Sequence, residues 1–148
     1  DDDDYWLPNK IEMQINAMKD SKCLISCTDG YFGKGVYDEN KVKQYKIYNK
    51  EKYFGVLKSI FNKKGKKHLL KNEFPKIWTK EFVKVHNCTI ASSVMINKEL
   101  INKIGYFDNK YWAPDYDYWL RAIEHTDLIY LDLPLLYYDG GHGDGQNY

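Results

Sequence analysis

The sequence predicts a mixed α/β fold, because strand-like and helix-like segments alternate along its 148 residues. Short apolar, β-prone runs lie at 23–28, 89–96 and 128–138. Helical patterns lie at 8–19 and 98–104. A chain of this length can hold one domain with a core. We therefore expect a mixed sheet with flanking helices, and we expect the acidic run 1–4 at the carboxyl-end edge of that sheet.

The first helix is predicted over 8–19. Pro8 suits a first helical position, and apolar residues recur at the spacing of one helix face: Ile11, Ile15 and Met18. A charged face should carry Lys10, Glu12 and Lys19. The following run, 23–28, is predicted to be a strand that ends at the turn signal Asp29-Gly30.

The middle of the chain has a weaker pattern. We expect an extended excursion from Asp29 to Lys52 with one short strand at 42–48, then short helices at 56–61 and near 79–85. The stretch 62–68 is the most basic in the chain. It is either a solvated loop or a surface that attracts a phosphorylated or membrane-bound acceptor.

The second half contains clearer signals. The run 89–96 is expected to be a strand, or a turn of small residues followed by a strand. Asn97 is then expected to cap a helix over 98–104, which Gly105 ends. A further helix opens at Pro114 and has Asp115 in its first turn, where a carboxylate is favoured. The run 128–138 is predicted to form two short strands with a bend at Pro134. The glycine-rich loop 139–146 lets a backbone approach a ligand.

Bulk composition narrows the class of protein. The net charge of +1 gives no indication of a nucleic-acid partner. The three cysteines, Cys23, Cys27 and Cys88, form no CxxC pair, which favours reduced thiols and a cytoplasmic protein. No apolar run approaches the roughly 18–20 residues of a membrane span.

Four consecutive carboxylates, Asp1 to Asp4, repel one another unless a cation lies among them. Hard divalent cations such as Mg2+ or Mn2+ select carboxylate oxygens. The alternative is a solvated acidic terminus or an artificial leader. The continuation Tyr5-Trp6-Leu7-Pro8 favours a fixed site, because it joins the run to a helix through a sharp turn.

Three separated segments resemble glycosyltransferase family 2, the inverting enzymes of GT-A fold. The first, DDDDYWLPNKIE at 1–12, is similar to the metal-binding DxD segment of that family. The second, SVMINKELINKIGYFD at 93–108, is similar to a motif of its second half. The third, PDYDYWLR at 114–121, resembles the family's EDxDxWLR motif, with Pro114 in place of the usual Glu. The loop GGHGDGQ at 140–146 resembles a GGHxDQ loop of one branch, with Gly145 as an extra residue.

The resemblance implies a role for each matching residue. Asp3 is expected to bind the metal, Mn2+ or Mg2+, with Asp1 and His142 as further ligands. Asp1, Asp2, His142 and Arg121 are expected to contact the nucleotide-diphosphate sugar that serves as donor, and Asp4 to support them. Asp115 is expected to be the general base that takes the proton of the acceptor hydroxyl. A glycan or a lipid-linked molecule would be the acceptor.

The same resemblance implies that 1–148 is a partial catalytic domain, the metal-binding and acceptor-side half, without the N-terminal half that holds the nucleotide base. Two other functions stay open. The chain is a non-catalytic fragment or sugar-binding scaffold that needs a partner half, or it is a different metal enzyme such as a phosphoesterase. A phosphoesterase would be expected to have several histidine ligands near the acidic run, and this chain has only four histidines in all.

Overall fold

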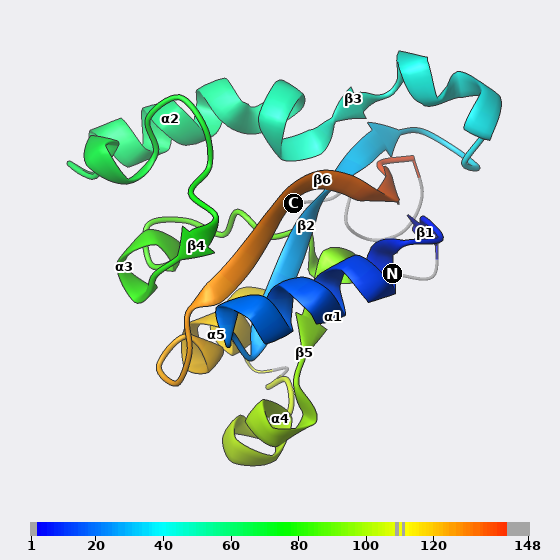
Figure 1. Cartoon of the computed structure of the whole chain (residues 1–148). Helices are drawn as coiled ribbons and strands as arrows, with labels where there is room; N and C mark the ends of the chain where they lie inside the picture. Colours follow the sequence, from blue (N-terminus) through cyan, green and yellow to red (C-terminus); the bar gives the residue numbers. More distant parts are fainter. Residues whose placement is uncertain (1–2, 109, 111, 142–148) are drawn as a thin grey trace.

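Two long parallel strands, β2 (Ile25–Gly33) and β6 (Leu128–Asp139), form the centre of the molecule. The structure is a computed structural model and describes residues 3–108, 110 and 112–141. Short antiparallel strands extend the pair at both ends: β1 (Tyr5–Trp6) and β4 (Ile77–Trp78) on β6, and β3 (Lys46–Ile47) and β5 (Met95–Ile96) on β2. The result is a curled mixed sheet with flanking helices (Figure 1), so the predicted mixed α/β class is confirmed.

Five α-helices in the described part of the chain surround this sheet: α1 (Lys10–Ser21), α2 (Phe54–Lys63), α3 (Lys80–Val83), α4 (Lys98–Ile104) and α5 (Pro114–Ala122). Short helical turns of other types lie between them: η1 (Glu39–Gln44), η2 (Tyr48–Tyr53), η3 (Lys67–Leu69) and η4 (Ala91–Ser93). Helix α1 packs across β2 and β6. No described helix is both long enough and apolar enough to cross a bilayer.

Aromatic side chains dominate the core under α2 and α3. Trp78 of β4 stacks on Tyr130 of β6 at 4.7 Å between ring centroids, and Phe82 of α3 lies 4.9 Å from Trp78. Phe61 of α2 is fully buried against Phe82. These contacts fix the short elements of 54–83 onto one end of the sheet.

The prediction for the buried face of α1 is wrong. Lys10 and Gln14 are fully buried, whereas Ile11 and Ile15 are 48% and 39% exposed. The buried pair is internally satisfied, because Lys10 Nζ donates to Gln14 Oε1 at 2.7 Å. The Gln14 amide in turn donates to Ser26 Oγ and to the Ser93 carbonyl, both at 2.9 Å. Polar groups can be buried at low cost when they are paired in this way. The helix also begins at Lys10, so Pro8 precedes it.

The predicted ends of both central strands are also wrong. Strand β2 continues through Asp29-Gly30 to Gly33. The buried Asp29 carboxylate accepts hydrogen bonds from the N–H groups of Gly30, Asn49 and Lys50 and from the Tyr130 hydroxyl, at 2.9–3.1 Å. Strand β6 continues through Pro134, which aligns with Asp29 where the register of the two strands shifts. The bend expected at Pro134 is therefore an irregularity within one strand.

Elsewhere in the described chain, the predicted helices agree well with the observed ones. The Asn97 side chain accepts from the Glu99 N–H and caps α4, and Gly105 follows it with φ = 78°. The helix predicted at 56–61 lies within α2, and the one near 79–85 corresponds to the short α3. The strand predicted within 42–48 is the two-residue β3. The run 89–96 forms the second of its two predicted structures, a turn followed by a strand, as η4 and β5.

Candidate active site

A hollow of about 590 Å3 lies beside the acidic run, where β2 and β6 end. Because the two strands are parallel, their carboxyl ends meet at the same edge of the sheet. The residues that line the hollow come from the start of the chain, the segment after β2 and the end of β6: Asp3, Asp4, Tyr5, Val36, Tyr37, Glu39 and Asp139. Four of these side chains are carboxylates, so the hollow has hard oxygen donors on several sides.

Asp4 is held by groups from two distant segments. Its Oδ2 accepts a hydrogen bond from Ser92 Oγ, and its Oδ1 accepts one from the Asp139 N–H at 2.9 Å. Burial raises the pKa of Asp4, and these two hydrogen bonds lower it in part. Ser92 also accepts, through its carbonyl, the Trp6 indole N–H at 3.0 Å. Asp4 is therefore fixed to the turn η4 and to the end of β6.

Asp139 joins the two segments that leave the central strands. Its Oδ1 accepts from the N–H of Gly35 at 2.8 Å and of Gly141 at 2.7 Å. Gly140 is required here, since a Cβ atom at this position would lie 2.4 Å from the Phe32 ring. This glycine thus lets the backbone approach a side chain of the protein. The approach of the loop 139–146 to a ligand stays a prediction, because 142–146 lie outside the described residues.

Tyrosines form the aromatic wall of the hollow. The Tyr5 and Tyr37 rings stack at 4.7 Å with 12° between their planes. Behind them Tyr45 packs against Tyr37 and against Tyr137, whose hydroxyl donates to the Gly35 carbonyl at 2.7 Å. Carboxylates beside an exposed aromatic face suit a polyhydroxylated ring, because the carboxylates accept from hydroxyls and the aromatic face packs on C–H groups.

Asp115 occupies the first turn of α5, next to Pro114 at the helix start. It is half-buried, and its Oδ2 accepts from the Asn87 side-chain amide at 3.1 Å. The Oδ1 of Asn87 accepts from the N–H and hydroxyl of Thr89, at 3.2 and 2.6 Å. The surrounding polar contacts therefore orient the Asp115 carboxylate.

The segment 87–92 connects Asp115 with the acidic run. Asn87, at one end, contacts Asp115, and Ser92, at the other, contacts Asp4. Five residue steps span at most about 18 Å between Cα atoms, and the helical turn η4 at Ala91–Ser93 shortens this further. The Cα atoms of Asn87 and Ser92, whose side chains contact Asp115 and Asp4, are therefore less than about 18 Å apart.

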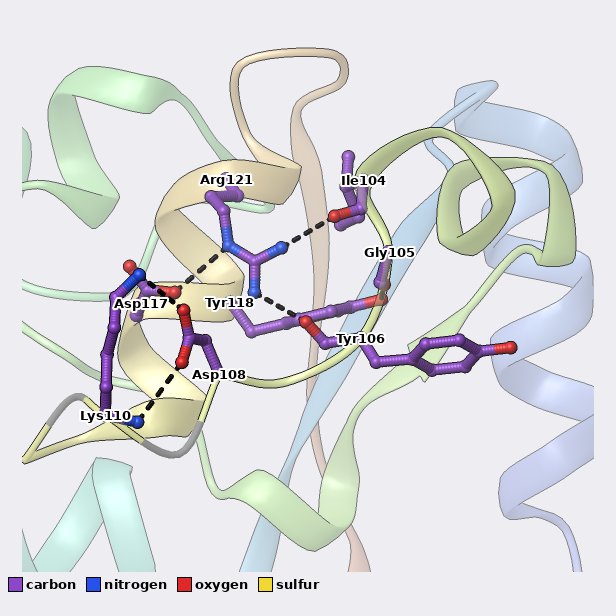
Figure 2. Close-up of polar contacts among 8 residues, drawn as sticks. All are labelled: Ile104, Gly105, Tyr106, Asp108, Lys110, Asp117, Tyr118 and Arg121. Carbon is purple, nitrogen blue, oxygen red and sulfur yellow. Dashed lines mark hydrogen bonds and ion pairs between the residues drawn. The ribbon is translucent and has the colours of Figure 1, made fainter.

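Arg121 makes contacts that connect α5 with the segment after α4. Its Nε donates to Asp117 at 3.0 Å, and its two terminal nitrogens donate to the carbonyls of Ile104 and Tyr106 at 2.7 and 2.9 Å (Figure 2). The Tyr118 hydroxyl donates to the Gly105 carbonyl at 2.9 Å in the same place. The expected contact of Arg121 with a cofactor stays a prediction, and its observed contacts are structural.

Three predicted site residues, Asp1, Asp2 and His142, lie outside the described residues. Among 3–108, 110 and 112–141, no group of three or more His, Cys, Asp or Glu side chains is arranged to hold a metal ion. The oxygen donors of Asp3 and its neighbours are nevertheless of the type that Mg2+ and Mn2+ prefer. The expected metal ligands Asp3, Asp1 and His142 therefore stay a prediction.

The site also contains residues that sequence analysis missed: Ser92, Tyr37, Glu39 and Asp139. Asp139 could have been suspected, because it is the polar end of a long apolar run at an expected strand terminus. The others have no local signal. In comparisons with protein-family models, with curated proteins and with solved structures, the chain matched none.

Proposed function

We propose that the chain is the metal-binding and acceptor-side half of a GT-A-type glycosyltransferase. It would move a sugar from a nucleotide-diphosphate sugar to an acceptor hydroxyl with inversion. The observation that carries this proposal is the carboxylate- and tyrosine-lined hollow at the carboxyl ends of β2 and β6, with Asp4 fixed at its rim. Ligands of α/β proteins commonly bind at this edge of the sheet.

The chemistry requires two separate functions from the protein. The leaving nucleoside diphosphate develops negative charge, which a divalent cation bound by Asp3 would neutralise. The acceptor hydroxyl loses a proton as it attacks, and Asp115 would receive it. The Asn87 amide supports this role, because it holds one Asp115 oxygen at a fixed position. A single displacement with the base opposite the leaving group inverts the anomeric carbon.

Helix α1 offers a surface for the N-terminal half of such a domain. Ile11 and Ile15 are exposed, and Trp6 nearby is 48% exposed. Apolar side chains grouped in this way favour contact with a further part of the protein. The cytoplasm is the compartment we propose, supported by the three cysteines, all of which are buried free thiols.

The metal site can be tested by adding Mn2+ to the 15N-labelled chain, because a bound Mn2+ broadens nearby amide signals. We expect broadening of Asp4, Gly35 and Asp139, and an affinity for Mn2+ that rises when a nucleoside diphosphate is added. Asp3→Ala should remove this broadening, whereas Asp20→Ala, an exposed carboxylate on α1, should leave it unchanged. Broadening that persists in Asp3→Ala, or that is spread evenly over the chain, would contradict the proposal.

The sugar-binding scaffold is the second candidate, favoured by the Tyr5–Tyr37 stack. It predicts binding of a simple saccharide in the presence of EDTA and no effect of Mn2+ or nucleotide. The transferase predicts that the nucleoside diphosphate and Mn2+ bind interdependently. Calorimetry with the same protein under both conditions separates the two functions.

A further inference from the structure

The positive charge of the protein is concentrated in one segment. Between residues 58 and 84 there are nine lysines and two glutamates, which gives +7. The whole chain has a formal net charge of +1, so all other residues together carry −6. The small net charge of the chain is therefore the sum of a strongly basic segment and a remainder with a net negative charge.

The structure gathers this segment on one side of the molecule. The end of α2, η3, β4 and α3 lie together, and they lie far from β1 (Figure 1). Lys64 Nζ donates to the Val85 carbonyl, and Lys66 pairs with Glu81 at 2.6 Å, so the end of α2 is tied to α3. The basic segment is consequently held against the fold and is not a loose loop.

Four of these lysines are exposed and have neither an ion pair nor a side-chain hydrogen bond in the described part of the chain. They are Lys63, Lys67, Lys71 and Lys76. Both glutamates of the segment are exposed, but only Glu81 pairs with its lysines. We call Lys63, Lys67, Lys71 and Lys76 the lysine surface.

We propose that the lysine surface docks the protein on an anionic phospholipid membrane. Clusters of 4–8 basic residues bind acidic headgroups through diffuse attraction, which needs charge but no fixed geometry. Lysine suits this role, because it is a compact charge on a flexible stem. The segment contains no arginine, the residue preferred for bidentate contacts with single phosphates.

The same surface is poorly suited to a single-stranded nucleic acid. Single strands bind through aromatic side chains that stack on bases. All four aromatic residues of the segment are buried in the core: Phe61, Phe74, Trp78 and Phe82. The surface thus offers charge alone, and this favours a membrane. The inference goes beyond glycosyl transfer and does not depend on it.

Cosedimentation with vesicles tests the proposal. The probes are phosphatidylcholine vesicles and vesicles of phosphatidylcholine mixed equally with phosphatidylglycerol. We expect binding only to the anionic vesicles, and loss of binding when salt is raised toward 1 M, where the screening length falls to about 3 Å. Substituting glutamine at Lys63, Lys67, Lys71 and Lys76 should weaken partitioning by at least about tenfold.

A second fourfold variant provides the matched control. Lys19, Lys43, Lys98 and Lys103 are also exposed and without a described ion-pair partner, and they lie outside the basic segment. Their substitution by glutamine changes the net charge equally, but should leave partitioning within about twofold of the parent. Equal losses in both variants, absence of binding to anionic vesicles, or tighter binding to single-stranded RNA than to vesicles would overturn the proposal.

Discussion

The backbone N–H of Asp139 donates to Asp4 Oδ1 at 2.9 Å and thereby joins residues 135 positions apart. The second oxygen of Asp4 accepts from Ser92, 88 positions away. One carboxylate therefore connects the acidic run, the turn η4 and the end of β6. The geometry of the candidate active site depends on this connection, because Asp4 and Asp139 both line the hollow, together with residues of the segment that follows β2.

Asp4→Asn should lower the free energy of unfolding by about 1–3 kcal/mol. The amide keeps one acceptor oxygen but presents an NH2 group to the other donor, so one of the two hydrogen bonds is lost or inverted. Urea unfolding monitored by circular dichroism measures the change. The control is Asp20→Asn, since Asp20 is exposed and has no described hydrogen bond. If both variants are equally stable, the connection through Asp4 contributes nothing.

Tyr37→Ala should weaken binding of a saccharide to the hollow by about 2- to 10-fold, since an aromatic contact is worth about 0.5–1.5 kcal/mol. Tyr37→Phe retains the ring that stacks on Tyr5, so it should bind like the parent. Saturation-transfer NMR with a panel of methyl glycosides gives the relative affinities. Tyr106→Ala serves as the control, because Tyr106 is 84% exposed and does not line the hollow. Parent-like binding by Tyr37→Ala would exclude the tyrosine wall as a sugar contact.

Local signals predicted some elements correctly. Helix α4 is the clearest case, because a capping side chain at Asn97 and a residue with positive φ at Gly105 mark its two ends within the sequence itself. The roles given to Asp4 and Asp115 also come from short motifs, and they stay predictions. These features depend on residues within a few positions of one another.

Features that depend on distant residues were missed. Asp29-Gly30 has the composition of a turn, but β2 continues because Asn49, Lys50 and Tyr130 donate to the Asp29 carboxylate. The buried face of α1 could not be predicted either, since Ser26 and Ser93 are what make burial of Gln14 favourable. Periodicity records only which side chains are apolar, and tertiary partners override it here.

Lys10 should make the stability of the protein depend on pH in the alkaline range. Burial lowers the pKa of Lys10 to about 8 from its ordinary value of 10.5, so folding favours the neutral amine. The resulting stabilisation is fully present above pH 10.5 and is lost as the pH falls through about 8. The free energy of unfolding of the parent relative to Lys10→Met should therefore rise between these values.

Urea unfolding of both proteins at several pH values between 7 and 10.5 measures this difference. The comparison removes the titration of tyrosines and other lysines, which is common to both. Lys19→Met, at an exposed position of the same helix, is the control and should show no such rise. A constant difference between the parent and Lys10→Met would mean that Lys10 keeps its ordinary pKa in the folded protein.

Asp115→Asn should lower turnover by about 100-fold or more in the active enzyme, the usual effect of losing a general base. The Asn side chain matches Asp in size, and its oxygen can still accept the Asn87 amide hydrogen bond. Folding and donor binding should therefore be nearly unchanged, while the capacity to accept a proton is lost.

If Asp115 instead only stabilises the start of α5, its substitution should lower the melting temperature slightly and leave turnover within a few-fold of the parent. Measuring turnover, donor affinity and melting temperature on this variant and on Asp127→Asn, an exposed carboxylate outside the helix, separates these outcomes. In the second case the base would have to be sought elsewhere, and Asp117 is a poor substitute because its carboxylate already pairs with Arg121 at 3.0 Å.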